Sequence, residues 1–81
     1  MTVRVLFFSV LRDITGAEEV SFDVPHGESI AGLLTALFAK WPALQKWDQS
    51  LLIAVDQTYA KRDAGLHENA EVAIMPPVQG G

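Results

Sequence analysis

The feature that most restricts the fold of this chain is one amphipathic helical segment set among strand-like segments. Between Ser29 and Pro42, apolar residues recur every three or four positions and therefore share one helix face. Ser29 suits the N-cap position, and Pro42 disfavours helical geometry at the residue before it. The stripe predicts a helix that packs on a sheet, and its members are Ile30, Leu33, Leu34, Leu37, Phe38 and Trp41.

Two strand-like segments precede this helix. Residues 2–10 are rich in Val, Leu and Phe, which favours a strand, and a turn is expected at residues 13–16. Residues 18–24 alternate apolar and polar side chains, which predicts a half-buried strand that forms a hairpin with the first.

The segments after the helix are also strand-like. Residues 51–55 form a continuous apolar run, typical of a strand buried on both faces. The expected order is a short link at 43–48, the strand 51–55, a turn at 56–57, a short strand at 58–60, a loop at 61–70 and a last strand at 71–75.

This order predicts an α+β fold with a mixed four- or five-stranded sheet and one long helix on one face. A ubiquitin-like β-grasp satisfies it. A ferredoxin-like split would want a second long helix, and periodicity alone does not choose between the two. We expect one domain over residues 1–75 and a flexible C-terminal tail over residues 76–81.

Composition excludes several classes of function. The chain has no cysteine, which excludes disulfides, thiolate nucleophiles and iron–sulfur ligation. Its net charge of −4 argues against nucleic acid as a partner. No apolar run is long enough to cross a membrane, and the N-terminus does not read as a signal peptide, so a cytoplasmic location is expected. His26 and His67 stand singly in expected turns, and we predict no metal site.

The C-terminal segment is the strongest candidate for chemistry. No serine has a nucleophile-elbow context, and no two carboxylates are marked as an acid–base pair. The last strand, in contrast, continues into Pro76-Pro77-Val78, and the sequence ends at Gly80-Gly81. Prolines hold a segment extended, and glycines make it thin enough for a narrow channel. Such a tail can present a terminal carboxylate inside another protein, although Gly-Gly alone is a weak signal.

Three segments resemble the small, sulfur-carrying subunit of molybdopterin synthase. They are residues 5–13 (VLFFSVLRD), 52–57 (LIAVDQ) and 71–81 (EVAIMPPVQGG). The resemblance covers nearly the whole chain, and the ending is its most specific part. It implies a ubiquitin-like β-grasp fold and a sulfur-transfer cycle in molybdenum cofactor biosynthesis.

In that cycle, an activating enzyme uses ATP to adenylate the C-terminal carboxylate, and a sulfur donor then leaves a thiocarboxylate. The resemblance places the thiocarboxylate on Gly81, with Gly80, Val78, Pro77 and Pro76 as the threading tail. The large synthase subunit receives this tail, and sulfur passes to cyclic pyranopterin monophosphate to form molybdopterin. The implied assembly is a heterotetramer, and the small subunit binds no cofactor and is not catalytic alone.

A partner surface is also expected beside the tail. By alternation, Phe8 and Met75 lie on the outer sheet face, where they would form an apolar patch. Family members use apolar side chains at positions matching Phe8, Tyr59 and Met75 to contact the large subunit and the activating enzyme.

Two alternative functions remain open at this point. The chain could carry sulfur for another pathway, such as thiamine synthesis or tRNA thiolation, although thiamine carriers are usually shorter and lack the two prolines. It could also be a β-grasp interaction module without chemistry, in which case removing Gly81 would leave its function intact.

Overall fold

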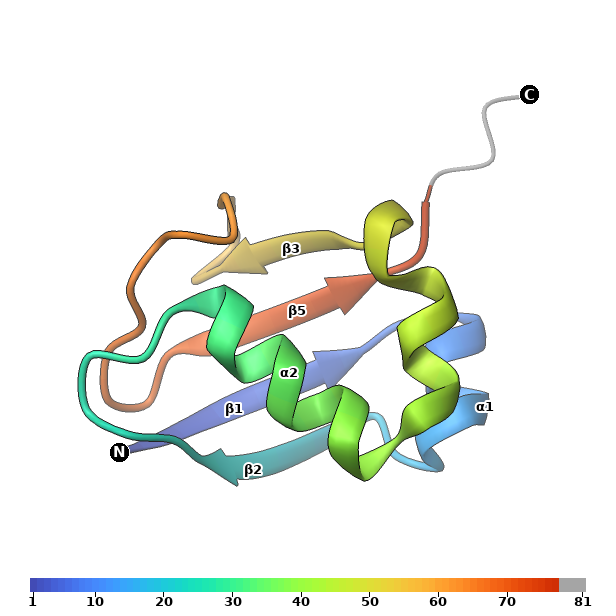
Figure 1. The fold of residues 1–81 in the computed structure, drawn as a ribbon, viewed down its shortest axis with the longest axis horizontal. Coiled ribbons are helices and arrows are strands. Elements are labelled where there is room, and N and C mark those ends of the chain that lie inside the picture. Colours follow the sequence, from blue (N-terminus) through green and yellow to red (C-terminus); the bar gives the residue numbers. More distant parts are fainter. Residues whose placement is uncertain (78–81) are drawn as a thin grey trace.

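The computed structural model describes residues 1–77 of the chain. The strands and the long helix follow the predicted order (Figure 1), and a short helix that was not predicted lies between the first two strands. The elements are β1 (Thr2–Phe7), α1 (Val10–Thr15), β2 (Glu19–Asp23), α2 (Ile30–Lys40), the 3₁₀ helix η1 (Pro42–Ser50), β3 (Leu52–Val55), β4 (Thr58–Tyr59) and β5 (Glu71–Met75).

The strands form one mixed sheet in the order β2-β1-β5-β3-β4. β1 pairs with β2 antiparallel and with β5 parallel, and β3 pairs antiparallel with both β5 and β4. The predicted hairpin of the first two strands is therefore confirmed, and the first and last strands are neighbours in the sheet. Among residues 1–77 the second α-helix, α1, has only six residues, so the long helix that a ferredoxin-like split requires is missing from this part of the chain.

Helix α2 lies across one face of the sheet (Figure 1). It begins as predicted at Ser29, whose Oγ accepts a hydrogen bond from the Gly32 amide at 3.2 Å. Its residues Leu33 and Leu37 are fully buried, and so are Val5 in β1 and Val72 in β5. The helical stripe and the inward-facing strand residues thus form a single apolar core.

The first strand is shorter than predicted. It ends at Phe7, and residues 10–15 form helix α1 where the sequence indicated further strand and a turn. Ser9 breaks the extended chain with a φ of 56°, and Gly16 ends the helix in the left-handed conformation. Leu11 is fully buried on α1, so its packing overrides the β preference of Val10 and its β-branched neighbours.

The β3–β4 hairpin agrees with the sequence in most respects. Asp56 and Gln57 form the predicted turn, with φ values of 51° and 70°, as a two-residue hairpin loop requires. Burial of β3 on both faces holds only in part, because Ile53 and Ala54 are buried while the other two residues of the strand are half-buried. Each face of β3 thus carries one buried and one half-buried residue.

None of the helices in the described part of the chain is long and apolar enough to cross a membrane.

Candidate functional site: the outer sheet face and the start of the tail

The sheet face turned away from α2 carries a run of apolar side chains. Strand register places Leu6 beside Ala73, Leu52 beside Met75, and Tyr59 beside Ala54 on this face. Tyr59 is 71% exposed, which makes it the only largely exposed large apolar residue among residues 1–77. We define the outer patch as Leu6, Phe8, Leu52, Tyr59, Ala73 and Met75.

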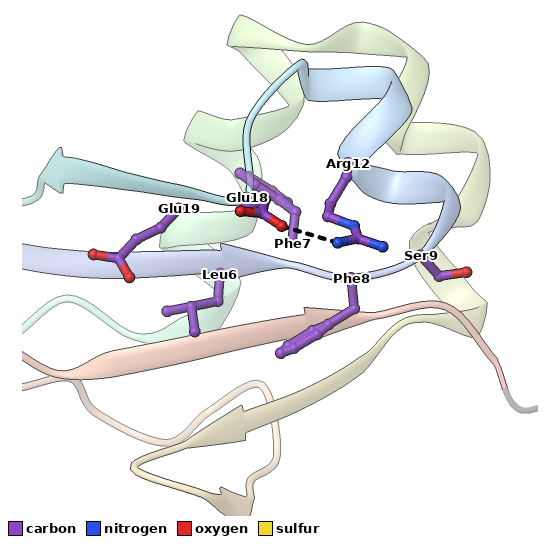
Figure 2. A pocket seen from close by; sticks show the side chains of 7 residues that line it. All are labelled: Leu6, Phe7, Phe8, Ser9, Arg12, Glu18 and Glu19. Carbon is purple, nitrogen blue, oxygen red and sulfur yellow. Dashed lines mark hydrogen bonds and ion pairs between the residues drawn. The ribbon is translucent and has the colours of Figure 1, made fainter.

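Phe8 joins this patch although it lies just beyond β1. Its amide donates to the Ile74 carbonyl at 3.2 Å, which keeps the chain against β5 for one more residue. Leu6 and Phe8 point to the same side of β1, and Phe7 lies on the other (Figure 2). Phe7 packs edge-on against Trp41 at a centroid distance of 5.4 Å in the core. The alternation predicted from the sequence therefore persists through Phe8.

Charged residues border the outer patch at the β1–β2 edge. A groove of about 370 Å³ lies there, and Arg12 and Glu18 pair across it at 3.0 Å (Figure 2). Further along, Arg4 lies 3.5 Å from Glu71 and 4.0 Å from Glu19. The groove is lined by Leu6, Phe7, Phe8, Ser9, Arg12, Glu18 and Glu19. An apolar centre with a charged border is the usual composition of a protein-binding surface.

The predicted tail begins directly after Met75, a member of the outer patch. β5 ends at Met75, and the half-buried Pro76 and Pro77 follow directly. Any partner that covers Met75 is therefore next to the start of the tail. The remaining tail residues predicted from the sequence, Val78, Gly80 and Gly81, lie outside the described residues.

The three predicted partner-binding residues lie on one face but are not all adjacent. Phe8 and Met75 lie at the same end of neighbouring strands. Tyr59 lies on β4, two strands from β5, which corresponds to about 10 Å. The sheet surface around them is filled by Leu6, Leu52 and Ala73. Their place in the patch follows from the strand register, and the sequence alone does not show how β3 pairs with its neighbours.

The two histidines are both exposed but have different neighbours. His26 is exposed in the turn after β2, as predicted. His67 is also exposed, but its Nε2 lies 2.5 Å from Asp56 Oδ2, a contact that the sequence reasoning missed. Among residues 1–77, no three His, Cys, Asp or Glu side chains come close enough to hold a metal ion.

Comparison with known proteins assigns the chain to a family. The sequence profile of the ThiS family matches residues 5–81. A molybdopterin synthase sulfur carrier subunit from Escherichia coli K12 is 41% identical over 81 residues, which cover 98% of this chain and 99% of the relative. The chain belongs to the ThiS family. Its resemblance to molybdopterin synthase small subunits, inferred above from three segments, therefore extends over almost the full length of both proteins.

Solved structures confirm the predicted ubiquitin-like β-grasp fold of this ThiS-family chain. A small archaeal modifier protein, SAMP1 from Haloferax volcanii, superposes with a TM-score of 0.87 at 24% identity, and both chains are fully covered. The molybdopterin-converting factor of Helicobacter pylori, solved as a complex of its subunits 1 and 2, contains a chain that matches with a TM-score of 0.70 at 23% identity and full coverage of both chains. These likenesses establish the fold alone.

Proposed function

We propose that this protein is the sulfur carrier subunit of a molybdopterin synthase, with the Gly81 carboxylate as its working group. The observation that carries the proposal is the continuity of β5 with the tail. One strand both contributes Met75 to the outer patch and leads directly into Pro76 and Pro77. Docking of a partner on the patch thereby brings the tail to that partner.

The chemistry proceeds in two steps at Gly81. The carboxylate attacks the α-phosphorus of ATP and releases pyrophosphate, because a free carboxylate is a poor electrophile and needs a leaving group. Hydrosulfide released by a sulfur donor then attacks the acyl carbon, AMP departs, and loss of the proton from sulfur leaves a thiocarboxylate. The activating enzyme consumes the ATP, and this chain supplies only the acyl group.

The choice of pathway is supported by similarity rather than by geometry. Molybdopterin synthase sulfur carrier subunits from Escherichia coli and Mycobacterium tuberculosis are 41% and 37% identical to this chain over at least 96% of each relative. The partner in this proposal is the large synthase subunit, two copies of each forming a heterotetramer. Sulfur would pass there to cyclic pyranopterin monophosphate.

The intact mass of the protein tests the carrier function. The full chain is incubated with ATP, an activating enzyme of this family and a sulfur donor. We expect a mass gain equal to the exchange of one oxygen for one sulfur, located by fragmentation at Gly81. A variant lacking Gly81 is expected to show no gain, since its tail ends one residue earlier, at Gly80, and no longer reaches the activating site.

The control for this experiment is a second sulfur carrier known to be a substrate of the same enzyme. If that carrier gains sulfur and this chain does not, the carrier function is refuted and an interaction module becomes the better description. If sulfur is gained but is not transferred in the presence of the large subunit and the pterin substrate, the carrier serves a different pathway, such as thiamine synthesis or tRNA thiolation.

A further inference from the structure

We propose that Asp56 and doubly protonated His67 form a pH-sensitive clip that fixes the β3–β4 hairpin and, with it, Tyr59 on the outer patch. The clip joins the hairpin turn to the loop that precedes β5, two segments separated by eleven positions in the chain. It lies at the opposite end of β5 from Met75 and the tail, so it is separate from the sulfur chemistry.

The ring of His67 faces two acceptors. Nε2 lies 2.5 Å from Asp56 Oδ2, and Nδ1 lies 2.9 Å from the backbone carbonyl of Glu68. A carboxylate and a carbonyl accept hydrogen bonds and cannot donate them. Both contacts are hydrogen bonds only when both ring nitrogens carry a proton, so the geometry selects the imidazolium. Loss of one proton leaves a single N–H, which can satisfy only one of the two acceptors.

Asp56 is held from a second direction by β5. Its Oδ1 accepts a hydrogen bond from the Glu71 amide at 3.1 Å, and its own amide donates to the Glu71 carbonyl at 2.8 Å. The carboxylate therefore links β5 to His67 through two different oxygens. Since Asp56 and Gln57 both have positive φ, the hairpin turn adopts a conformation that few residue types favour, and these contacts stabilise it.

The loop on the other side of the clip is anchored to β1. The Thr2 amide donates to Glu68 Oε2 at 2.6 Å, and the Asn69 amide donates to the Thr2 carbonyl at 2.7 Å. His67 itself accepts a backbone hydrogen bond from the Ala70 amide at 3.0 Å. The clip thus ties the two-residue strand β4, at the sheet edge, to a loop that is fixed to the sheet centre.

The charged and polar groups around the clip favour a doubly protonated His67. Asp56, the Glu68 carbonyl and the Glu71 backbone face the clip directly, and Arg4 lies near enough to influence the Asp56 carboxylate. The hydrogen bond with Asp56, followed by that with Glu68, raises the pKa of His67 above 6.5. The hydrogen bond from the Glu71 amide, followed by that with His67, lowers the pKa of Asp56 below 3.8.

These directions define the pH range in which the clip is closed. A raised histidine pKa means that the contribution of His67 to stability is complete below pH 6.5 and is lost as the pH rises through its folded-state pKa. A lowered carboxyl pKa means that the contribution of Asp56 is present above pH 3.8 and is lost as the pH falls through its folded-state pKa. The clip is therefore closed between the folded-state pKa of Asp56 and that of His67, and it opens as the pH rises through the folded-state pKa of His67.

Nuclear magnetic resonance of the full chain tests the clip without any partner. The ring ¹⁵N shifts of His67 report its protonation across a pH titration, and amide exchange reports order in residues 56–59. Exchange is expressed as a protection factor, the unstructured-chain rate divided by the observed rate at the same pH, because hydroxide catalysis makes every amide exchange faster as the pH rises. We expect the His67 midpoint above 6.5, with lower protection factors of the hairpin amides once the ring is neutral. Asp56→Asn, which keeps the shape and tolerates positive φ, is expected to lower the midpoint and remove the pH dependence of the protection factors.

His26→Gln is the matched control, because it removes the other histidine from a turn that has no part in the clip. It is expected to leave the His67 midpoint and the hairpin exchange unchanged. A His67 midpoint at or below 6.5 that Asp56→Asn does not move would overturn the proposal. So would hairpin protection factors that follow the same pH profile in wild type and in His67→Gln.

The effect on docking rests on the proposed function and is measured separately. Binding to the large synthase subunit is compared below and above the His67 midpoint for wild type and His67→Gln, with the pH profile of His26→Gln as reference. We expect only His67→Gln to lose the decrease in affinity on the alkaline side. If the clip titrates as described but affinity is equally pH-dependent in all three proteins, the clip stands as a structural device and its role at the patch is refuted.

Discussion

The two faces of the sheet are built from the same strands but differ in what their side chains do. On the face beneath α2, Val5, Val72 and Ile74 are fully buried and belong to the continuous core. On the opposite face, their immediate neighbours Leu6, Ala73 and Met75 remain only half-buried. Because side chains alternate along each strand, consecutive residues contribute to two different apolar surfaces. The first surface is covered by α2, and the second remains at the surface of the molecule.

This difference separates stability from binding. A buried side chain contributes to the free energy of unfolding through the area it removes from water and through close packing. A half-exposed apolar side chain gains most of its burial only when a partner covers it. Substitutions on the inner face should therefore change folding, and substitutions on the outer face should change affinity.

The largest expected effect is on the inner face. Leu37→Ala removes a fully buried side chain where α2 packs on the sheet, and it is expected to lower the free energy of unfolding by about 2–5 kcal/mol. Urea denaturation followed by circular dichroism measures this. Ala39→Gly, at an exposed position of the same helix, controls for helix propensity and should cost about 1 kcal/mol. A loss for Leu37→Ala no greater than that of the control would contradict the assignment of this face as the core.

The next effect is on the outer face. Tyr59→Ala is expected to weaken binding to the large synthase subunit by about 1–3 kcal/mol, while stability changes by about 0.5 kcal/mol or less because the ring is already exposed. Isothermal titration calorimetry measures the affinity. Thr35→Ala, on the exposed side of α2 and away from the sheet, should bind like wild type. Equal affinities for wild type and Tyr59→Ala would remove Tyr59 from the predicted interface.

The sequence predicted the fold well wherever one periodicity governed a long segment. The apolar stripe from Ile30 to Trp41 located α2, and the alternation of apolar and polar residues located β2. The prolines after Met75 located the end of β5. Helix α1 escaped prediction because its six residues are too few to show a helical period, and because burial of Leu11 and the positive φ of Ser9 are tertiary features.

The candidate site was predictable only in part for a related reason. Phe8 and Met75 could be placed on one face, because alternation along a single strand needs no knowledge of its neighbours. The pairing of Asp56 with His67 depends on how a hairpin and a loop meet in space, and no local pattern encodes that contact. The role of Gly81 comes from family resemblance, and it remains a prediction that concerns residues beyond those described.

The smallest expected effect concerns the N-cap of α2, the helix that covers the inner face of the sheet. Ser29→Ala removes the Oγ that accepts the Gly32 amide, so that donor is left without its capping partner at the helix N-terminus. The expected cost is about 1 kcal/mol of stability, with affinity for the large subunit unchanged.

Thr35→Ala is again the matched control, because its hydroxyl bonds only to a carbonyl within the helix, Ala31, and alanine favours helix formation. Stability measured by urea denaturation should therefore fall for Ser29→Ala and not for Thr35→Ala. If the Ser29 variant instead lost affinity at unchanged stability, α2 would have to contact the partner, and the division of folding and binding between the two sheet faces would fail.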